Sequence, residues 1–125
     1  MGKVDLKQRT KLFALKVINF VEGLPNKRTA EILGRQLLRS GTSAGANYRS
    51  ACRARSAADF IAKMGIVEEE IDESIYWMEL LVESGIINTK DTQDLMKEAN
   101  ELLAITVSSI KTARKNRKQN GFLNS

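Results

Sequence analysis

The sequence contains no histidine, a single cysteine (Cys52), a single proline (Pro25) and a single tryptophan (Trp77). The absence of histidine removes the usual general base at neutral pH and the commonest metal ligand. A lone cysteine cannot form an internal disulfide, which is typical of a reducing, cytoplasmic compartment. The shortage of proline favours long, uninterrupted helices.

Several kinds of functional segment are also missing from the sequence. No apolar run approaches the roughly 20 residues of a membrane span, and no apolar segment follows Met1 as a signal peptide would require. There is neither a Walker-type phosphate loop nor the Glu-x-x-His pairs of di-iron bundles. We therefore expect a cytoplasmic protein that is not an enzyme, with no membrane partner, cofactor, metal site or identifiable small-molecule substrate.

Apolar residues make up 42% of the 125 residues and recur with helical spacing in four segments. These segments run from about Asp5 to Glu22, 27 to 55, 57 to 83, and from Thr89 or Asp91 to about Arg114. Short links between them predict an all-α, antiparallel up-down-up-down four-helix bundle. We expect one domain over residues 1–115 and a frayed basic tail over 116–125.

Residues that favour helix ends support these boundaries. Asp5, Asn26 and Ser56 are suitable N-caps, and Asp59 three residues after Ser56 resembles an acidic capping box. The second and third segments either turn sharply or continue as one bent rod, and we favour a turn. Gly85 suits the position just past a helix end.

The second helical segment carries a row of arginines along one side. Plotted at 100° per residue, they all fall within roughly 40° of Arg35. This arginine row consists of Arg28, Arg35, Arg39, Arg49 and Arg53. It is either a solvated cationic face or a surface for phosphate or carboxylate groups, which arginine binds in bidentate fashion.

Small residues lie on the opposite side of the same segment. Gly41, Ala44 and Gly45 allow a second helix to approach closely, which offsets the poor helix propensity of glycine. Asn47 lies at the edge of this helix-packing face, either buried with a partner or at the rim. Cys52 lies beside it among arginines, and we expect a small buried side chain rather than a reactive thiol.

The third segment carries the negative charge, with seven acids and no base between Lys63 and Lys90, although the whole chain has a net charge of +5. Its outer side also carries large apolar residues, which mark contact sites more often than chance exposure does. We predict a subunit interface there; alternatively, Trp77 lies across a flank of its own bundle. The predicted interface residues are Ile66, Glu69, Glu73, Tyr76, Trp77 and Leu80.

Three stretches of the chain resemble a known family: Ser40–Ser56 (SGTSAGANYRSACRARS), 59–70 (DFIAKMGIVEEE) and 72–81 (DESIYWMELL). They are similar to the small bacterial four-helix-bundle proteins encoded within intervening sequences of 23S ribosomal RNA genes. Many relatives carry Asn-Ile-Ala-Glu-Gly where this chain has Asn-Tyr-Arg-Ser-Ala (47–51), so a role tied to that glutamate does not transfer. The resemblance implies a bundle that assembles as a ring-like homo-oligomer, a homopentamer, and it implies no reaction.

Two functions follow from these patterns. The first is a non-catalytic homo-oligomer that binds nucleic acid, with RNA the expected partner, through the arginine row and the basic tail. The alternative is a protein-interaction scaffold. In that case the arginine row pairs with the acidic third helix of a neighbouring subunit, through Glu69, Asp72 and Glu73.

Overall fold

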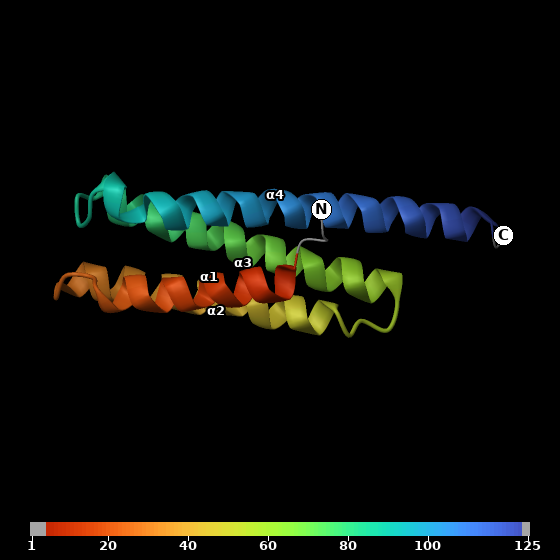
Figure 1. Ribbon diagram of the computed structural model, residues 1–125, viewed down its shortest axis with the longest axis horizontal. Coiled ribbons are helices and arrows are strands. Elements are labelled where there is room, and N and C mark those ends of the chain that lie inside the picture. The colour runs from red at the N-terminus through yellow and green to blue at the C-terminus, as the bar shows by residue number, and fades with distance from the viewer. Residues whose placement is uncertain (1–4, 124–125) are drawn as a thin grey trace.

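The computed structural model describes residues 5–123, with side chains described as far as residue 119. This range holds four helices and no strand: α1 (Leu6–Glu22), α2 (Arg28–Ala51), α3 (Ala57–Glu83) and α4 (Thr89–Leu123). Successive helices run in opposite directions (Figure 1). The predicted all-α, up-down-up-down four-helix bundle is therefore confirmed.

Capping interactions explain why α1 and α3 begin where the sequence predicted. The Asp5 carboxylate accepts a hydrogen bond from the N–H of Gln8, and the Ser56 hydroxyl accepts one from the N–H of Asp59, each at 3.1 Å. Both bonds satisfy backbone donors that have no partner within the helix. Just after α3, Gly85 has a φ of 82°, a left-handed conformation that glycine adopts without a side-chain clash.

The predicted ends of α2 were wrong. Its N-cap is Lys27 rather than Asn26, and the Lys27 side chain makes no capping hydrogen bond. The helix ends at Ala51 rather than near Arg55. The N–H of Arg53 bonds the carbonyl only three residues earlier, at 3.0 Å, which tightens the last turn. A turn follows, so α2 and α3 are separate helices, as favoured from the sequence.

Helix α4 is longer than predicted. Its predicted end lay near Arg114, whereas the helix continues to Leu123. No proline or glycine interrupts the chain between Thr89 and Asn120, so nothing forces an earlier stop. The basic segment that was expected to be a frayed tail is helical as far as residue 123, and residues 124–125 lie outside the described range.

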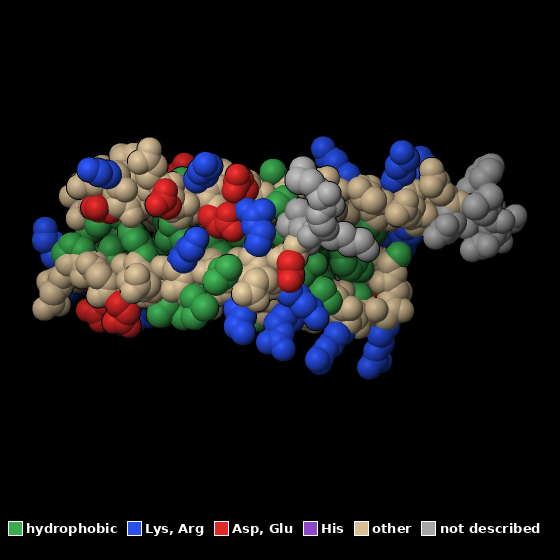
Figure 2. Space-filling model, in the orientation of Figure 1, with side chains coloured by type: hydrophobic (Ala, Val, Ile, Leu, Met, Phe, Trp, Pro, Cys, Tyr) green, Lys and Arg blue, Asp and Glu red, His purple; other side chains and the backbone are tan. Residues whose placement is uncertain are grey.

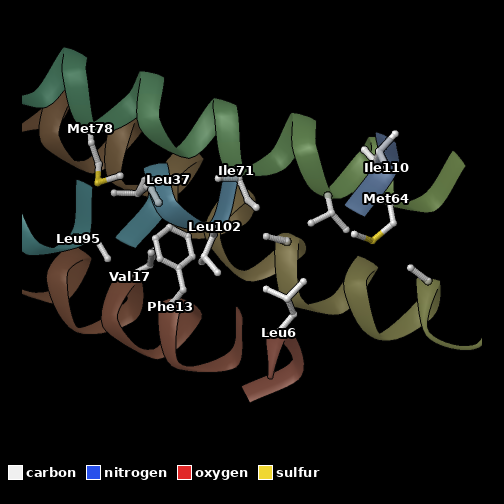
Figure 3. Packing of buried hydrophobic residues seen from close by; sticks show 14 of the residues in the cluster. Leu6, Phe13, Val17, Leu37, Met64, Ile71, Met78, Leu95, Leu102 and Ile110 are labelled. Carbon is white, nitrogen blue, oxygen red and sulfur yellow. The ribbon is translucent and has the colours of Figure 1, made fainter. Parts of the chain in front are cut away.

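One apolar cluster, to which all four helices contribute, forms the core (Figure 3). Phe13, Leu37, Ile71 and Leu102, one from each helix, are fully buried. Helix α2 packs along both α1 and α3, and α3 packs along α4. The contact between α1 and α4 is sparser, and here Arg9 of α1 reaches across to two glutamates of α4.

A buried polar contact fixes how α2 and α3 align. The hydroxyls of Ser40 and Ser74 lie 2.8 Å apart, and both side chains are fully buried. Ser74 also lies 2.9 Å from the carbonyl oxygen of Glu70. With Ser40 donating to Ser74 and Ser74 donating to that carbonyl, both protons are satisfied, which offsets the cost of burying the hydroxyls.

Helices α1 and α2 approach closely at two glycines. A Cβ atom built on Gly41 would lie 2.8 Å from Val17 Cγ2, and one built on Gly45 would lie 3.3 Å from the carbonyl oxygen of Thr10. A larger side chain at either position would push the helices apart. The close approach places the outer residues of α1 beside those of α2.

Candidate nucleic-acid interface

All five side chains of the arginine row are exposed, and four of them belong to the single continuous helix α2. Arg53 lies in the turn just after the helix, so the row extends beyond the last residue of α2. The row therefore follows the whole length of this edge of the bundle.

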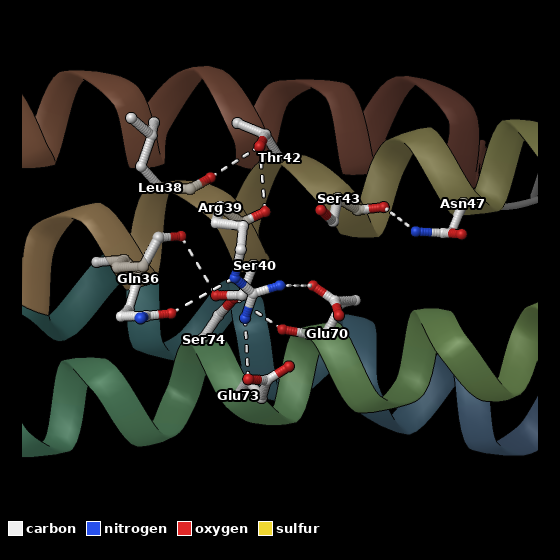
Figure 4. A network of polar contacts seen from close by, with 11 residues as sticks. Gln36, Leu38, Arg39, Ser40, Thr42, Ser43, Asn47, Glu70, Glu73 and Ser74 are labelled. Carbon is white, nitrogen blue, oxygen red and sulfur yellow. Dashed lines mark hydrogen bonds and ion pairs between the residues drawn. The ribbon is translucent and has the colours of Figure 1, made fainter.

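Arg39 is not free, because α3 provides two carboxylates for it (Figure 4). Its guanidinium lies 3.2 Å from the Glu70 carboxylate and 2.9 Å from the Glu73 carboxylate, and its Nε donates to the Gln36 side chain at 3.4 Å. This pairing was not predicted from the sequence, because the alignment of α2 with α3 cannot be deduced from either helix alone. Arg35 is also paired, with Glu31 one turn earlier at 3.1 Å.

The two acids that hold Arg39 differ in their surroundings. The side chain of Glu70 is 13% exposed and that of Glu73 is 42% exposed. Burial raises the pKa of Glu70 above its ordinary value, and the positive charge of Arg39 partly opposes this effect. Of the two carboxylates, Glu70 is therefore the one whose charged form depends more on Arg39.

Arg28, Arg49 and Arg53 form no ion pair with any carboxylate among residues 5–119. Figure 2 shows basic side chains gathered along one edge of the molecule, over the start of α1 and the C-terminal half of α2. These three arginines are the members of the row whose charge is left for an external anion.

Helix α1 adds cations that the sequence analysis did not select. Lys7 and Lys11 line a groove of about 550 Å³ between α1 and α2, together with Arg49. Their spacing of four residues places both lysines on one side of α1, which the sequence does indicate. Which side of α1 faces α2 was not evident without the bundle.

The predicted packing residues lie as follows. Ala44 is fully buried, and Gly41 and Gly45 are the buried contact points with α1. Asn47 is a half-buried rim residue whose side-chain N–H donates to the carbonyl of Ser43 on its own helix, at 2.9 Å.

The residues of the predicted interface on α3 differ in their exposure to solvent. Ile66 is 42% exposed and Tyr76 is 51% exposed. Trp77 is half-buried against the core of its own bundle, as the alternative interpretation described. Its ring meets the Tyr76 ring edge-on at 5.1 Å between centroids, and its Nε1 is buried without an acceptor among the described residues. Leu80 is half-buried and Glu69 is exposed.

The expectation that Cys52 is buried was wrong, because its side chain is exposed at the C-cap of α2. Its neighbour one turn earlier, Tyr48, is half-buried. Burial, together with a smaller effect of a hydrogen bond with Cys52, raises the pKa of Tyr48 to about 12. The shift stems mainly from the cost of placing a phenolate in an apolar environment.

Within the described part of the chain, no group of three or more histidine, cysteine, aspartate or glutamate side chains is arranged to hold a metal ion. Among the described helices, none has an apolar stretch long enough to span a membrane.

Comparison with known proteins identifies the family. Residues 2–108 match the family described as 23S rRNA-intervening sequence protein. The chain belongs to this family. A member of the S23 ribosomal protein family from Bacteroides thetaiotaomicron, whose crystal structure is described as that of a protein with unknown function, is 36% identical in sequence. The match covers 84% of this chain and 97% of that one, with a TM-score of 0.79. No curated protein matches this member of the 23S rRNA-intervening sequence protein family.

Proposed function

We propose that this protein is a non-catalytic homo-oligomer that binds nucleic acid, with RNA as the ligand, through the arginine row. The observation that carries the proposal is the exposure of Arg28, Arg49 and Arg53 without a carboxylate partner among the described residues. Unpaired guanidinium groups along one edge suit a phosphate backbone, which binds mainly by displacing counterions. The names of the family and of the Bacteroides protein refer to the ribosome, so ribosomal RNA is the first ligand to test.

Assembly would strengthen such binding. Three unpaired arginines make a modest site, and a ring of subunits repeats it, which raises avidity without new contacts. Exposed Ile66 and Tyr76 supply apolar surface for a subunit contact, and the family resemblance supplies the expected number of five subunits.

The test is the binding of fluorescently labelled RNA at 50 and 200 mM salt. We expect binding at low salt that weakens steeply at high salt. The variant Arg49→Glu with Arg53→Glu should bind roughly a hundredfold more weakly or worse, because it removes two contacts and each hydrogen bond to a charged group contributes about 1.5–3 kcal/mol.

The control is Lys90→Glu with Lys97→Glu, which makes the same change in net charge at exposed positions of α4. This control should retain most of the affinity. Equal losses in the two double variants would mean that only net charge matters, and an absence of binding at low salt would refute the proposal.

The contact between Arg39 and α3 favours one alternative function, the scaffold. Within a single chain, an arginine of the row already pairs with Glu70 and Glu73. The same chemistry could join the unpaired arginines to exposed Glu69 and Asp72 of a neighbouring subunit. If Arg49→Glu with Arg53→Glu breaks up the assembly while RNA fails to bind the unmodified protein, the scaffold is the correct function.

A further inference from the structure

Two separate hollows lie between α1 and α2, and they differ in charge. The first is the groove beside the start of α1 and the C-terminal half of α2, which three cationic side chains line: Lys7, Lys11 and Arg49. The second lies beside the link between α1 and α2, and its arginine, Arg35, is already paired with Glu31. The positive charge available to a ligand is therefore concentrated in the groove.

Small residues keep the groove open. Gly45 packs directly on the backbone of Thr10, and the neighbouring lining side chains of Ala14, Thr42 and Ala46 are short. The cationic side chains rise from the two walls, the lysines from α1 and the arginine from α2. An extended anion can lie between them and meet charge from both sides.

One carboxylate, that of Asp5, also lines the groove. It accepts the N–H of Gln8 as the cap of α1, so it already has a structural partner. Three cations against one carboxylate leave the groove positive. Lys7, Lys11 and Arg49 form no ion pair with the described carboxylates.

The lining favours the backbone of a nucleic acid over its bases. No aromatic side chain lines the groove, so it lacks the stacking surface on which single-stranded bases are usually held. Its two lysines, Arg49 and Gln8 can all donate hydrogen bonds to phosphate and sugar oxygens.

From these observations we infer that the groove lined by Lys7, Lys11 and Arg49 holds the sugar-phosphate backbone of the nucleic acid, without reading its sequence. The inference rests on the proposed function and specifies the ligand moiety and the α1 residues that contact it. Lys7 and Lys11 lie about 6 Å apart along the helix axis, so one strand can contact both.

The experiment measures the slope of log affinity against log salt for three unstructured RNAs of equal length and different base composition. The variant Lys7→Gln with Lys11→Gln should lower the steepness of the slope by about 1.4, because each phosphate contact contributes about 0.7 on a single strand. Affinity should fall by a similar factor for all three RNAs. Inorganic polyphosphate, which has no bases, should compete with RNA on the unmodified protein.

The matched variant Lys7→Arg with Lys11→Arg should keep the original slope, and all variants should keep the same unfolding temperature. Suppose that Lys7→Gln with Lys11→Gln leaves the slope unchanged while Arg49→Gln with Arg53→Gln lowers it. That result would refute the role of the groove lysines and would leave the proposed function standing. A loss confined to one RNA would overturn backbone recognition. If the unmodified protein binds no RNA, the proposed function fails first.

Discussion

At Gly41 the seam between α1 and α2 has no room for a side chain. The atoms that a new Cβ would meet belong to Val17, which is fully buried and stiff at χ1. We expect Gly41→Ala to destabilise the protein by about 1–2 kcal/mol, because the strain of overpacking exceeds the gain in helix propensity.

Gly65 is the matched control. It lies inside α3, and a Cβ there would have nothing within 4 Å. Gly65→Ala should therefore stabilise the protein by up to about 1 kcal/mol. Denaturant unfolding at one protein concentration measures both, and a Gly41→Ala protein more stable than its parent would contradict the packing described here.

Two carboxylates should give opposite dependences of stability on pH. Burial raises the pKa of Glu70, so its contribution to stability is present below its unfolded pKa and is lost as the pH rises through its folded pKa. Glu70→Gln should therefore gain stability relative to the parent as the pH is raised from 4 to 7. Unfolding by denaturant at a series of pH values checks this.

Asp59 should behave in the opposite sense. Hydrogen bonds from Lys63 and from the backbone of Arg55 lower its pKa, so its contribution is present above its unfolded pKa and is lost as the pH falls. Asp59→Asn should lose stability relative to the parent at neutral pH, with the difference shrinking in acid. If the free energy of unfolding changes with pH in the same direction for both variants, these two carboxylates do not cause the pH dependence of stability.

The residues that the sequence analysis missed share one physical cause. The helical periodicity of each segment can be read from the sequence, so the arginine row was placed on one side of α2. The pairing of Arg39 with α3, and the position of Lys7 and Lys11 across from Arg49, depend on how neighbouring helices align. No pattern within a single helix contains that information. The burial of Cys52 was misjudged because α2 stops one turn early.

At the scale of the helix, capping residues determine which boundaries are predictable. The limits of α3 were predicted correctly, because Ser56 and Gly85 give strong start and stop signals. The start of α2 was shifted by one residue, since Asn26 is the better cap by composition and Lys27 occupies the position. The end of α4 was placed too early because the composition became basic, although charge alone does not stop a helix.

The two N-caps of α2 and α3 provide a test. Ser56→Ala removes the hydrogen bond to the N–H of Asp59 and should cost about 1 kcal/mol. Lys27 has the extended backbone of an N-cap but no capping side chain, so Lys27→Ser should stabilise by up to about 1 kcal/mol. Thermal unfolding should show shifts of opposite sign, and a lower unfolding temperature for Lys27→Ser would contradict this account of α2.

At the scale of the whole molecule, the fold followed from the sequence more completely than the site did. Four amphipathic segments joined by short links leave few arrangements other than an antiparallel bundle. The surface that contacts a second molecule depends on which side chains remain exposed in the folded bundle. The side chains of Ile66 and Tyr76 are exposed, whereas that of Trp77 packs against the core of its own bundle.

We predict that light scattering will give a mass close to five times 13.9 kDa. Ile66→Glu with Tyr76→Glu should lower that mass, because charges placed in an apolar contact are costly to bury. The control, Leu12→Glu with Leu15→Glu, changes two equally exposed apolar residues on α1 and should leave the mass unchanged. A monomer at micromolar concentration would exclude the assembly.

The unequal lengths of the helices have a consequence for the charge of the molecule as a whole. Arg9, near the start of α1, meets Glu98 and Glu101, so the later part of α4 extends beyond the N-terminal end of α1 (Figure 1). After Glu101, α4 carries only basic charged residues, while the acids cluster between residues 68 and 83 of α3. The separation of these charges gives the protein a permanent electric dipole. In the field of a polyanion, such a dipole turns the basic end forward before contact, and added salt shortens the distance over which it does so.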